Sequence, residues 1–212
     1  LEFRSRESLR SIVVSSTITG EGKSVVASHL AAISAMLSRR TLLIDADLRR
    51  PILHTLFNLA PRPGITDVID SQRSLEETVQ QTNIANLSVL TCGELYGHPS
   101  RLLESNAMTS LLTEATRQYD CVIIDTPPLS ACADAHTLGR RSDGILLVTR
   151  PGFTIKEALK RAVSELTHNQ IPIIGVVVNG ITNQTEQYYR YPLNGYRSLS
   201  SRSLSSNITR NR

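Results

Sequence analysis

The fold is decided by residues 11–24, which read SIVVSSTITGEGKS. The apolar, β-branched start of this stretch, residues 11–15, predicts a buried strand, and a helical pattern of apolar residues begins at Ser24. Between strand and helix, the two glycines of Gly20-Glu21-Gly22 allow backbone N–H groups to turn inward. The amino end of a helix adds about half a positive charge at the same place. A strand, a glycine-containing loop and a helix in this order predict a phosphate-binding loop.

The residue types of this loop predict how a nucleotide would be held. Backbone N–H groups would surround phosphate oxygens, the Lys23 ammonium would reach the β- and γ-phosphates, and the Ser24 hydroxyl would ligate Mg²⁺. The predicted nucleotide contacts are Thr19, Gly20, Glu21, Gly22, Lys23, Ser24 and Val25. One position departs from the usual pattern GxxxxGK[ST], because Thr17 stands where the first glycine is expected.

Apolar runs recur along the chain at residues 41–44, 87–90, 121–124, 144–148 and 171–178. Most of them are continuous rather than alternating, which is typical of parallel strands buried on both faces. Helical patterns lie at residues 24–39, 101–118 and 154–167. In the first helix we expect Val25, Leu30, Ile33 and Leu37 on or near one face. The alternation predicts an α/β fold: a P-loop NTPase-like, doubly wound and mainly parallel sheet with helices on both faces.

Acidic residues follow two of the predicted strands. Asp125 comes directly after the run at 122–124, on the edge of the sheet where the phosphate loop also lies. Asp45 and Asp47 follow the run at 41–44 and would point the same way in an extended chain, with Arg49 close behind. Like charges this close repel unless a cation lies among them, and Mg²⁺ takes few protein ligands. We therefore expect a magnesium site formed by Ser24, Asp45 and Asp125.

The composition changes after Ile181, which predicts two parts. Residues 1–181 would form the phosphate-loop domain, and residues 182–212 a flexible tail rich in Ser, Arg, Asn and Tyr that cannot bury enough apolar surface to fold alone. Four of the six tyrosines lie in this tail: Tyr188, Tyr189, Tyr191 and Tyr196.

Charge and residue usage exclude several classes of function. Five arginines and one glutamate in residues 182–212 account for the whole net charge of +4, so the body has no basic surplus and we predict no nucleic-acid binding. Three scattered cysteines without a Cys-x-x-Cys pair, and five dispersed histidines, argue against disulfide, zinc, haem and iron–sulfur sites. The sequence contains no run of 18 apolar residues, so it predicts no membrane-spanning helix. Because the sequence starts at Leu1 without Met, we expect a piece of a longer protein.

Three motifs in this order resemble those of the bacterial tyrosine kinases of capsule and exopolysaccharide synthesis. That family has a Walker A loop, a Walker A′ motif of the form hydrophobic-Asp-x-Asp-x-Arg, and a Walker B motif of the form hydrophobic-Asp-x-x-Pro. The corresponding segments here are residues 20–24, 44–49 and 124–128. The similarity continues through residues 64–69, 98–105, 142–148 and 175–179, and covers about Leu9 to Ile181.

The resemblance implies an ATP- and Mg²⁺-dependent protein-tyrosine kinase that autophosphorylates its tyrosine cluster on a neighbouring copy. The implied catalytic residues are Lys23, Asp45, Asp47 and Asp125. Asp45 is favoured over Asp47 as the group that receives or orients the tyrosine proton, a choice the sequence leaves open, and Asn179 would face the adenine.

The family resemblance also implies partners and a location. These are a homo-oligomeric ring, a membrane-spanning polysaccharide copolymerase portion or partner, and a cognate tyrosine phosphatase. The kinase domain would lie on the cytoplasmic face of the plasma membrane and regulate polysaccharide polymerisation and export. A Glu-x-x-Arg-x-x-Arg segment that promotes ring assembly in the family is missing from residues 1–10, so we expect this chain to be weakly active and weakly associated.

Two other functions stay open at this point. A partition or division-site ATPase switch would share the fold, but that group has a signature lysine at the second position of the loop, where Ile18 stands here. A nucleotide-gated regulatory module of a polysaccharide exporter would bind nucleotide without turnover.

Overall fold

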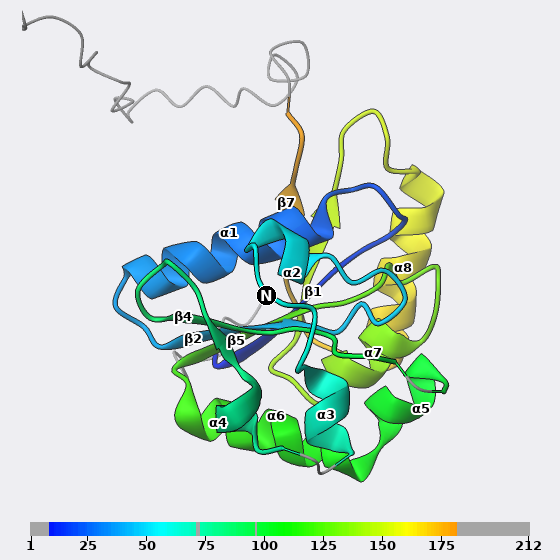
Figure 1. Ribbon diagram of the computed structural model, residues 1–212. Helices are drawn as coiled ribbons and strands as arrows, with labels where there is room; N and C mark the ends of the chain where they lie inside the picture. The colour runs from blue at the N-terminus through cyan, green and yellow to red at the C-terminus, as the bar shows by residue number, and fades with distance from the viewer. Residues whose placement is uncertain (1–8, 71–72, 96, 182–212) are drawn as a thin grey trace, which may run out of the picture. The chain divides into compact units, whose positions relative to one another are not determined.

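The described part of the chain forms a seven-stranded sheet with the strand order β3-β4-β2-β5-β1-β6-β7 (Figure 1). The structure is a computed structural model that describes residues 9–70, 73–95 and 97–181. The strands are β1 (Ser11–Ser16), β2 (Thr41–Asp45), β3 (Gln80–Gln81), β4 (Leu87–Leu90), β5 (Cys121–Asp125), β6 (Ile145–Thr149) and β7 (Ile173–Val178). Neighbouring strands are parallel except β3 and β4. The predicted doubly wound, mainly parallel sheet is confirmed.

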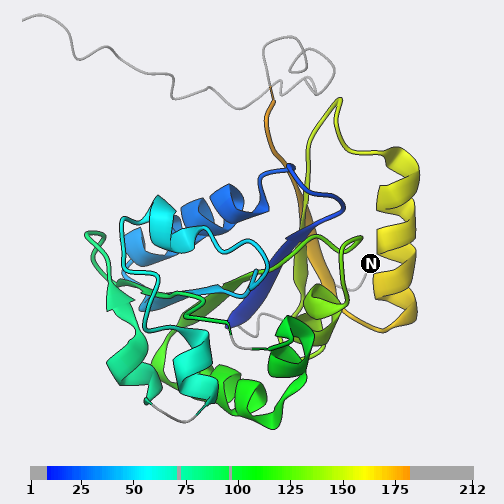
Figure 2. The ribbon, with the colours of Figure 1, turned by 45° about the vertical axis from the view of Figure 1, so that its right-hand side comes forward.

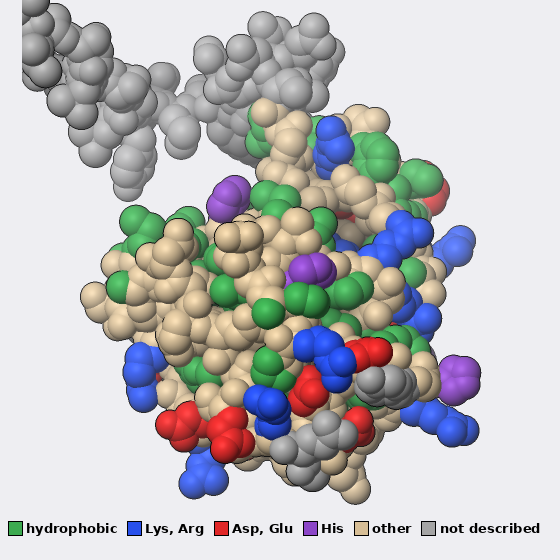
Figure 3. Space-filling model, viewed as in Figure 1, with side chains coloured by type: hydrophobic (Ala, Val, Ile, Leu, Met, Phe, Trp, Pro, Cys, Tyr) green, Lys and Arg blue, Asp and Glu red, His purple; other side chains and the backbone are tan. Residues whose placement is uncertain are grey.

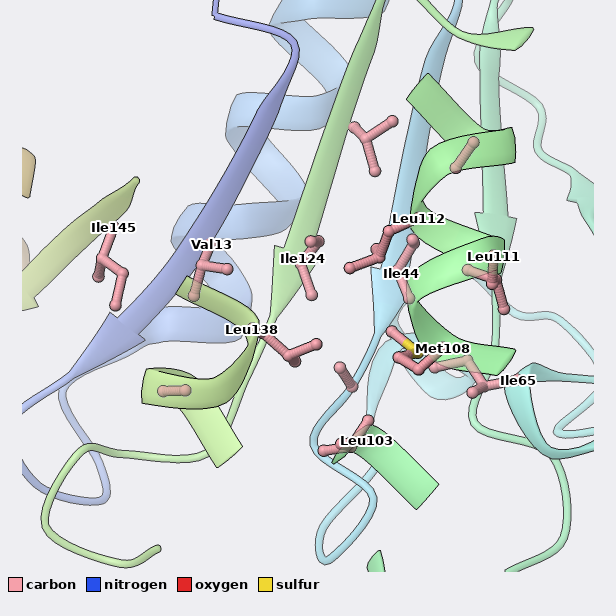
Figure 4. Packing of buried hydrophobic residues seen from close by; sticks show 14 of the residues in the cluster. Val13, Ile44, Ile65, Leu103, Met108, Leu111, Leu112, Ile124, Leu138 and Ile145 are labelled. Atoms are coloured by element: carbon pink, nitrogen blue, oxygen red, sulfur yellow. The ribbon is translucent and has the colours of Figure 1, made fainter. Parts of the chain in front are cut away.

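Helices cover both faces of this sheet, as Figures 1 and 2 show. Two lie on one face: α1 (Lys23–Met36) and α2 (Leu53–Leu56). Six lie on the other: α3 (Ile65–Ile69), α4 (Leu75–Thr78), α5 (Pro99–Glu104), α6 (Asn106–Gln118), α7 (Asp134–Gly139) and α8 (Lys156–His168). Alternate side chains of one strand enter the two cores, so that Leu43 packs under α1 while Ile44 packs on the opposite face. Figure 4 shows Val13, Ile44 and Ile124 pointing from the sheet toward α6 and α7.

The predicted helix over residues 101–118 is in fact two helices. The first, α5, ends at Glu104, and Ser105 adopts an extended conformation between α5 and α6. The Ser105 hydroxyl accepts a hydrogen bond from the Met108 N–H at 3.1 Å and so caps α6. Serine satisfies the orphan N–H groups of a helix start better than it fits a helix interior, which explains the break.

Of the apolar residues expected on or near one face of the first helix, Leu30 packs against the core, whereas Val25, Ile33 and Leu37 are exposed. Ala27, Ala31 and Ala35 of α1 are buried against the sheet, whereas Ile33 and Leu37 are 56% and 72% exposed. The alanine row allows the helix backbone to approach the strands closely, and this turns the larger apolar residues outward. Figure 3 shows hydrophobic side chains on the surface over α1 and α2.

The parallel strands direct several loops to one edge of the sheet. The loops after β1, β2, β4 and β5 all leave the carboxyl ends of the strands, where open α/β sheets bind their ligands. None of the helices in the described ranges is both long and apolar enough to cross a bilayer. The predicted tail, with Tyr188, Tyr189, Tyr191 and Tyr196, lies outside the described residues.

Candidate active site

The loop between β1 and α1 has the backbone conformation that a phosphate-binding loop needs. Gly20 and Gly22 have φ values of +90° and +89°, in the left-handed region that favours glycine. Thr17, in contrast, does not have a positive φ, so its backbone conformation does not require glycine. Its side chain is buried, and its carbonyl oxygen accepts a hydrogen bond from the Ser130 N–H at 3.2 Å. The departure at Thr17 therefore does not strain the backbone of the loop, although the Thr17 hydroxyl is buried without a hydrogen-bond partner among the described residues.

The buried side chain of Glu21 holds the phosphate-binding loop in place through hydrogen bonds. Its carboxylate is fully buried and accepts hydrogen bonds from the Ile18 N–H at 2.8 Å and from the Thr154 hydroxyl. The Asn179 side-chain amide donates to the Glu21 carbonyl oxygen at 2.9 Å, and a Cβ on Gly22 would lie 2.1 Å from that amide nitrogen. The loop is thus tied to the segment after β6 and to the end of β7. Sequence reasoning missed Thr154, because no motif marks a contact across 133 residues.

Removing the Glu21 carboxylate is expected to weaken nucleotide binding. In Glu21→Ala the buried Ile18 N–H and Thr154 hydroxyl lose their acceptor, which should cost about 1–3 kcal/mol of stability and loosen the loop. We expect the Kd for ATP, measured by calorimetry with Mg²⁺, to rise several-fold, and Thr154→Val to show a smaller change in the same direction. Glu114→Ala, which alters an exposed glutamate on α6, is the matched control. An unchanged Kd in Glu21→Ala would contradict this bracing role.

Lys23 and Asp47 form an ion pair beside the loop. The Lys23 Nζ atom lies 2.8 Å from Asp47 Oδ2, and the two side chains are 14% and 5% exposed. Lys23 Nζ also lies 3.4 Å from the Ser24 hydroxyl oxygen. The other Asp47 carboxylate oxygen accepts a hydrogen bond from the Arg50 N–H at 3.1 Å. The predicted loop lysine and the second Walker A′ aspartate are therefore brought together.

Asp45 and Asp125 end neighbouring strands directly opposite each other in the parallel register. Both are fully buried. Asp45 Oδ2 accepts hydrogen bonds from the N–H groups of Ile52 and Leu53, at 3.1 and 2.9 Å. Within the described residues, Asp45 Oδ1 and both carboxylate oxygens of Asp125 have no hydrogen-bond partner. Buried acceptors of this kind are costly unless something else satisfies them.

Burial also shifts the protonation of both carboxyl groups. It raises the pKa of Asp45 to about 7, opposed by the Leu53 N–H and reinforced by the nearby charge of Asp125. It raises the pKa of Asp125 to about 6, opposed by the positive charge of Lys23. Two coupled carboxyl groups that titrate near neutral pH at a strand edge are typical of a functional site.

β2 ends at Asp45, and Asp47 lies in the loop that follows it. The two carboxylates consequently make different contacts, Asp45 with the N–H groups at the start of α2 and Asp47 with Lys23. Arg49 turns toward Ser100 and Asp134, at 3.1 and 3.4 Å.

The donor set fits a hydrated magnesium ion rather than a zinc ion. The unpaired oxygens of Asp125 and Asp45 and the Ser24 hydroxyl are hard ligands of the kind Mg²⁺ prefers, and Mg²⁺ keeps several waters and phosphate oxygens. Among residues 9–70, 73–95 and 97–181, no three His, Cys, Asp or Glu side chains gather as a protein-only metal cage.

Comparison with known proteins finds similarity to P-loop NTPases and to tyrosine kinases. The family model described as NUBPL iron-transfer P-loop NTPase, of the ParA group, matches residues 8–191. The tyrosine-protein kinase YwqD of Bacillus subtilis (strain 168) is 40% identical over 192 residues, which are 90% of this chain and 81% of YwqD. The tyrosine-protein kinase etk of Escherichia coli (strain K12) is 33% identical over 90% of this chain, but the match spans only 26% of etk.

A solved structure leads to the same group of proteins. The kinase domain of the Escherichia coli tyrosine kinase ETK matches with a TM-score of 0.81 at 31% identity, over 90% of this chain and 74% of that one. Together with the Walker A, A′ and B segments at one sheet edge, these similarities establish that the chain belongs to the bacterial tyrosine-kinase family, a branch of the ParA-type P-loop NTPases.

Proposed function

We propose that this chain is an ATP- and Mg²⁺-dependent protein-tyrosine kinase that phosphorylates tyrosines of residues 182–212, in trans between copies. The observation that carries the proposal is the set of unpaired, buried oxygens of Asp45 and Asp125 beside the Lys23–Asp47 pair. Phosphoryl transfer depends on positioning and on positive charge around the phosphates. Lys23 supplies one positive charge, and the oxygens of Asp45 and Asp125 would hold the magnesium ion that supplies the rest.

Each residue has a distinct role in this proposal. Lys23 and the N–H groups of residues 19–25 hold the phosphates. Ser24, Asp125 and Asp45 would hold Mg²⁺, which when bound would neutralise charge on the phosphate oxygens. Asn179, at the end of β7 and against the Glu21 carbonyl, is assigned to the adenine side.

The proton of the acceptor tyrosine is assigned to Asp45. The phenol oxygen attacks the γ-phosphorus, the bond from that phosphorus to the bridging oxygen breaks, and ADP leaves. The phenol has an ordinary pKa near 10, so its proton moves to a carboxylate as the transfer proceeds. Asp47 is ion-paired with Lys23, whereas Asp45 Oδ1 has no hydrogen-bond partner among the described residues and is the carboxylate oxygen left to receive or orient the proton.

The partners follow from the same proposal. We propose assembly with other copies, weakly for this chain, a membrane-spanning polysaccharide copolymerase portion or partner on whose cytoplasmic side the kinase acts, and a tyrosine phosphatase that resets the tail. We further propose that residues 182–212 act as a flexible tail that reaches a neighbouring active site, because a flexible segment of n residues spans about 5–6 Å × √n.

A second candidate is an ATPase switch without kinase activity, and the ParA-type family match favours it. Ile18 in place of the signature lysine, and the tyrosine cluster itself, count against this candidate. The sequence also has no Cys-x-x-Cys pair for the iron-transfer chemistry that the matching family description mentions. ADP release without phosphotyrosine would support the switch.

Mass spectrometry of the full chain after incubation with ATP and Mg²⁺ tests the kinase proposal. We expect phosphoryl groups on the tail peptides. Replacing Tyr188, Tyr189, Tyr191 and Tyr196 by Phe should remove most of the label while the Kd for ATP stays within about twofold. Tyr119→Phe, in the body of the chain, is the control. Full labelling of the four-fold variant would show that the tail is not the main acceptor.

A further inference from the structure

A polar cluster joins three loops at the carboxyl edge of the sheet. Arg49 follows β2, Ser100 lies in the first turn of α5 after β4, and Asp134 begins α7 after β5. The Ser100 hydroxyl donates to Asp134 Oδ1 at 2.8 Å and accepts from Arg49 Nη2 at 3.1 Å. Arg49 Nε lies 3.4 Å from Asp134 Oδ2. One buried carboxylate therefore holds both a serine from one loop and an arginine from another.

The cluster connects to the active site through a tight turn. Arg49 lies inside the turn at residues 47–50, in which the Arg50 N–H donates to both the carbonyl and the side-chain carboxylate of Asp47, each at 3.1 Å. The second carboxylate oxygen of Asp47 accepts the hydrogen bond from Lys23 at 2.8 Å. A contact that fixes Arg49 therefore also fixes the turn that aims Asp47 at Lys23.

Burial and charge indicate that this cluster orients the Arg49 side chain and adds little to the stability of the fold. The Asp134 side chain is 1% exposed and that of Arg49 is 42% exposed. An ion pair with one desolvated partner gains little net free energy, because desolvation offsets most of the attraction. The guanidinium of Arg49 nevertheless contacts two groups at once, the Ser100 hydroxyl through Nη2 and the Asp134 carboxylate through Nε, and two contacts to one planar group restrict its orientation.

We propose that Asp134, assisted by Ser100, is a positioning residue that acts through Arg49 to hold the turn at residues 47–50 and hence the Asp47–Lys23 pair. This inference rests on the proposed function, in which Lys23 holds the transferred phosphate. Asp134 contacts neither member of that pair, and its effect on turnover passes through Arg49.

Steady-state kinetics of variants of the full chain test this inference. Asp134→Asn keeps the shape of the side chain and removes its charge. We expect kcat for both phosphotyrosine formation and ATP hydrolysis to fall about tenfold while the KM for ATP stays within twofold, because a small displacement of a phosphate ligand affects the transition state most. Ser100→Ala, a milder change at a helix start, should lower kcat about threefold. Asp120→Asn is the matched control, since Asp120 pairs with Arg40 at the opposite, amino edge of the strands.

A double variant tests whether the effect passes through Arg49. Arg49→Lys keeps the positive charge but loses the planar guanidinium that contacts Ser100 and Asp134 together. It should therefore lower kcat as much as Asp134→Asn does. If the two residues act as one unit, Asp134→Asn combined with Arg49→Lys is no slower than either alone. Fully additive losses, or an Asp134→Asn kcat equal to that of the control, would overturn the inference. ATP hydrolysis without phosphotyrosine in the unmodified chain would sink the proposed kinase function instead, and the hydrolysis kcat would still decide the role of Asp134.

Discussion

Replacing Lys23 by Met is expected to lower the rate of phosphotyrosine formation by at least about 100-fold. The Lys23 ammonium is the one positive charge that the loop brings to the buried carboxylates of Asp47 and Asp125. Without it, the γ-phosphate loses the cation that would stabilise its developing charge. Quantitative anti-phosphotyrosine detection after addition of ATP and Mg²⁺ measures the effect, and Lys160→Met on the exposed face of α8 is the matched control.

The same substitution should also destabilise the protein, and a second substitution separates the two effects. Lys23→Met leaves the buried Asp47 carboxylate with the Arg50 N–H as its remaining hydrogen-bond donor among the described residues, which should cost about 1–3 kcal/mol of unfolding free energy. Adding Asp47→Asn removes the unpaired charge, so denaturant melts should recover most of this loss while activity stays absent. Activity that survives in Lys23→Met would show that the phosphates are held elsewhere.

Replacing Asp125 by Asn is expected to abolish Mg²⁺-dependent activity and yet to stabilise the protein. Both carboxylate oxygens of Asp125 are buried without a hydrogen-bond donor in the described part of the chain. Removing the charge therefore removes a desolvation cost, and we expect the free energy of unfolding in EDTA at pH 8 to rise by roughly 1–3 kcal/mol. Activity should fall at least about 100-fold because a metal ligand is lost. The exposed Asp70→Asn is the control, and a destabilised Asp125→Asn would contradict the expected gain.

The pH dependence of stability provides a second measurement on Asp125. Burial raises the pKa of Asp125 to about 6 and that of Asp45 to about 7, above the ordinary value near 4 of an unfolded chain. Between these values the folded state holds protons that the unfolded state has released. The free energy of unfolding should consequently fall as pH rises from about 4 to about 7. In Asp125→Asn the fall between about pH 4 and pH 6 should be about half as steep, because Asp45 alone still contributes there.

Much of this site could be predicted from the sequence, because its signals are local. A loop residue with positive φ is usually glycine, a buried parallel strand is a continuous apolar run, and an aspartate after such a run lies at the carboxyl edge of the sheet. For these reasons the prediction of the loop at residues 17–22, of the strand ends at Asp45 and Asp125, and of a mainly parallel sheet agrees with the structure. The order of the strands and the short antiparallel β3 were not predicted. The break between α5 and α6 also has a local signal, because Ser105 is a residue type that favours the start of a helix. The apolar pattern runs across Ser105 and hid this signal.

The contacts that hold the site in shape were decided by the tertiary structure alone. Glu21 meets Thr154, Arg49 meets Asp134, and Asp45 meets the N–H groups that begin α2. Each of these contacts depends on how the strands are ordered and on where their loops converge. The sequence around one residue of each pair does not indicate which residue it will contact. The outward position of Ile33 on α1 has the same origin, because the distance between helix and sheet, rather than the hydrophobicity of one residue, determines which face fits. Local patterns thus determined which elements form and where the chemical groups lie along the chain, whereas long-range packing determined which of those groups touch.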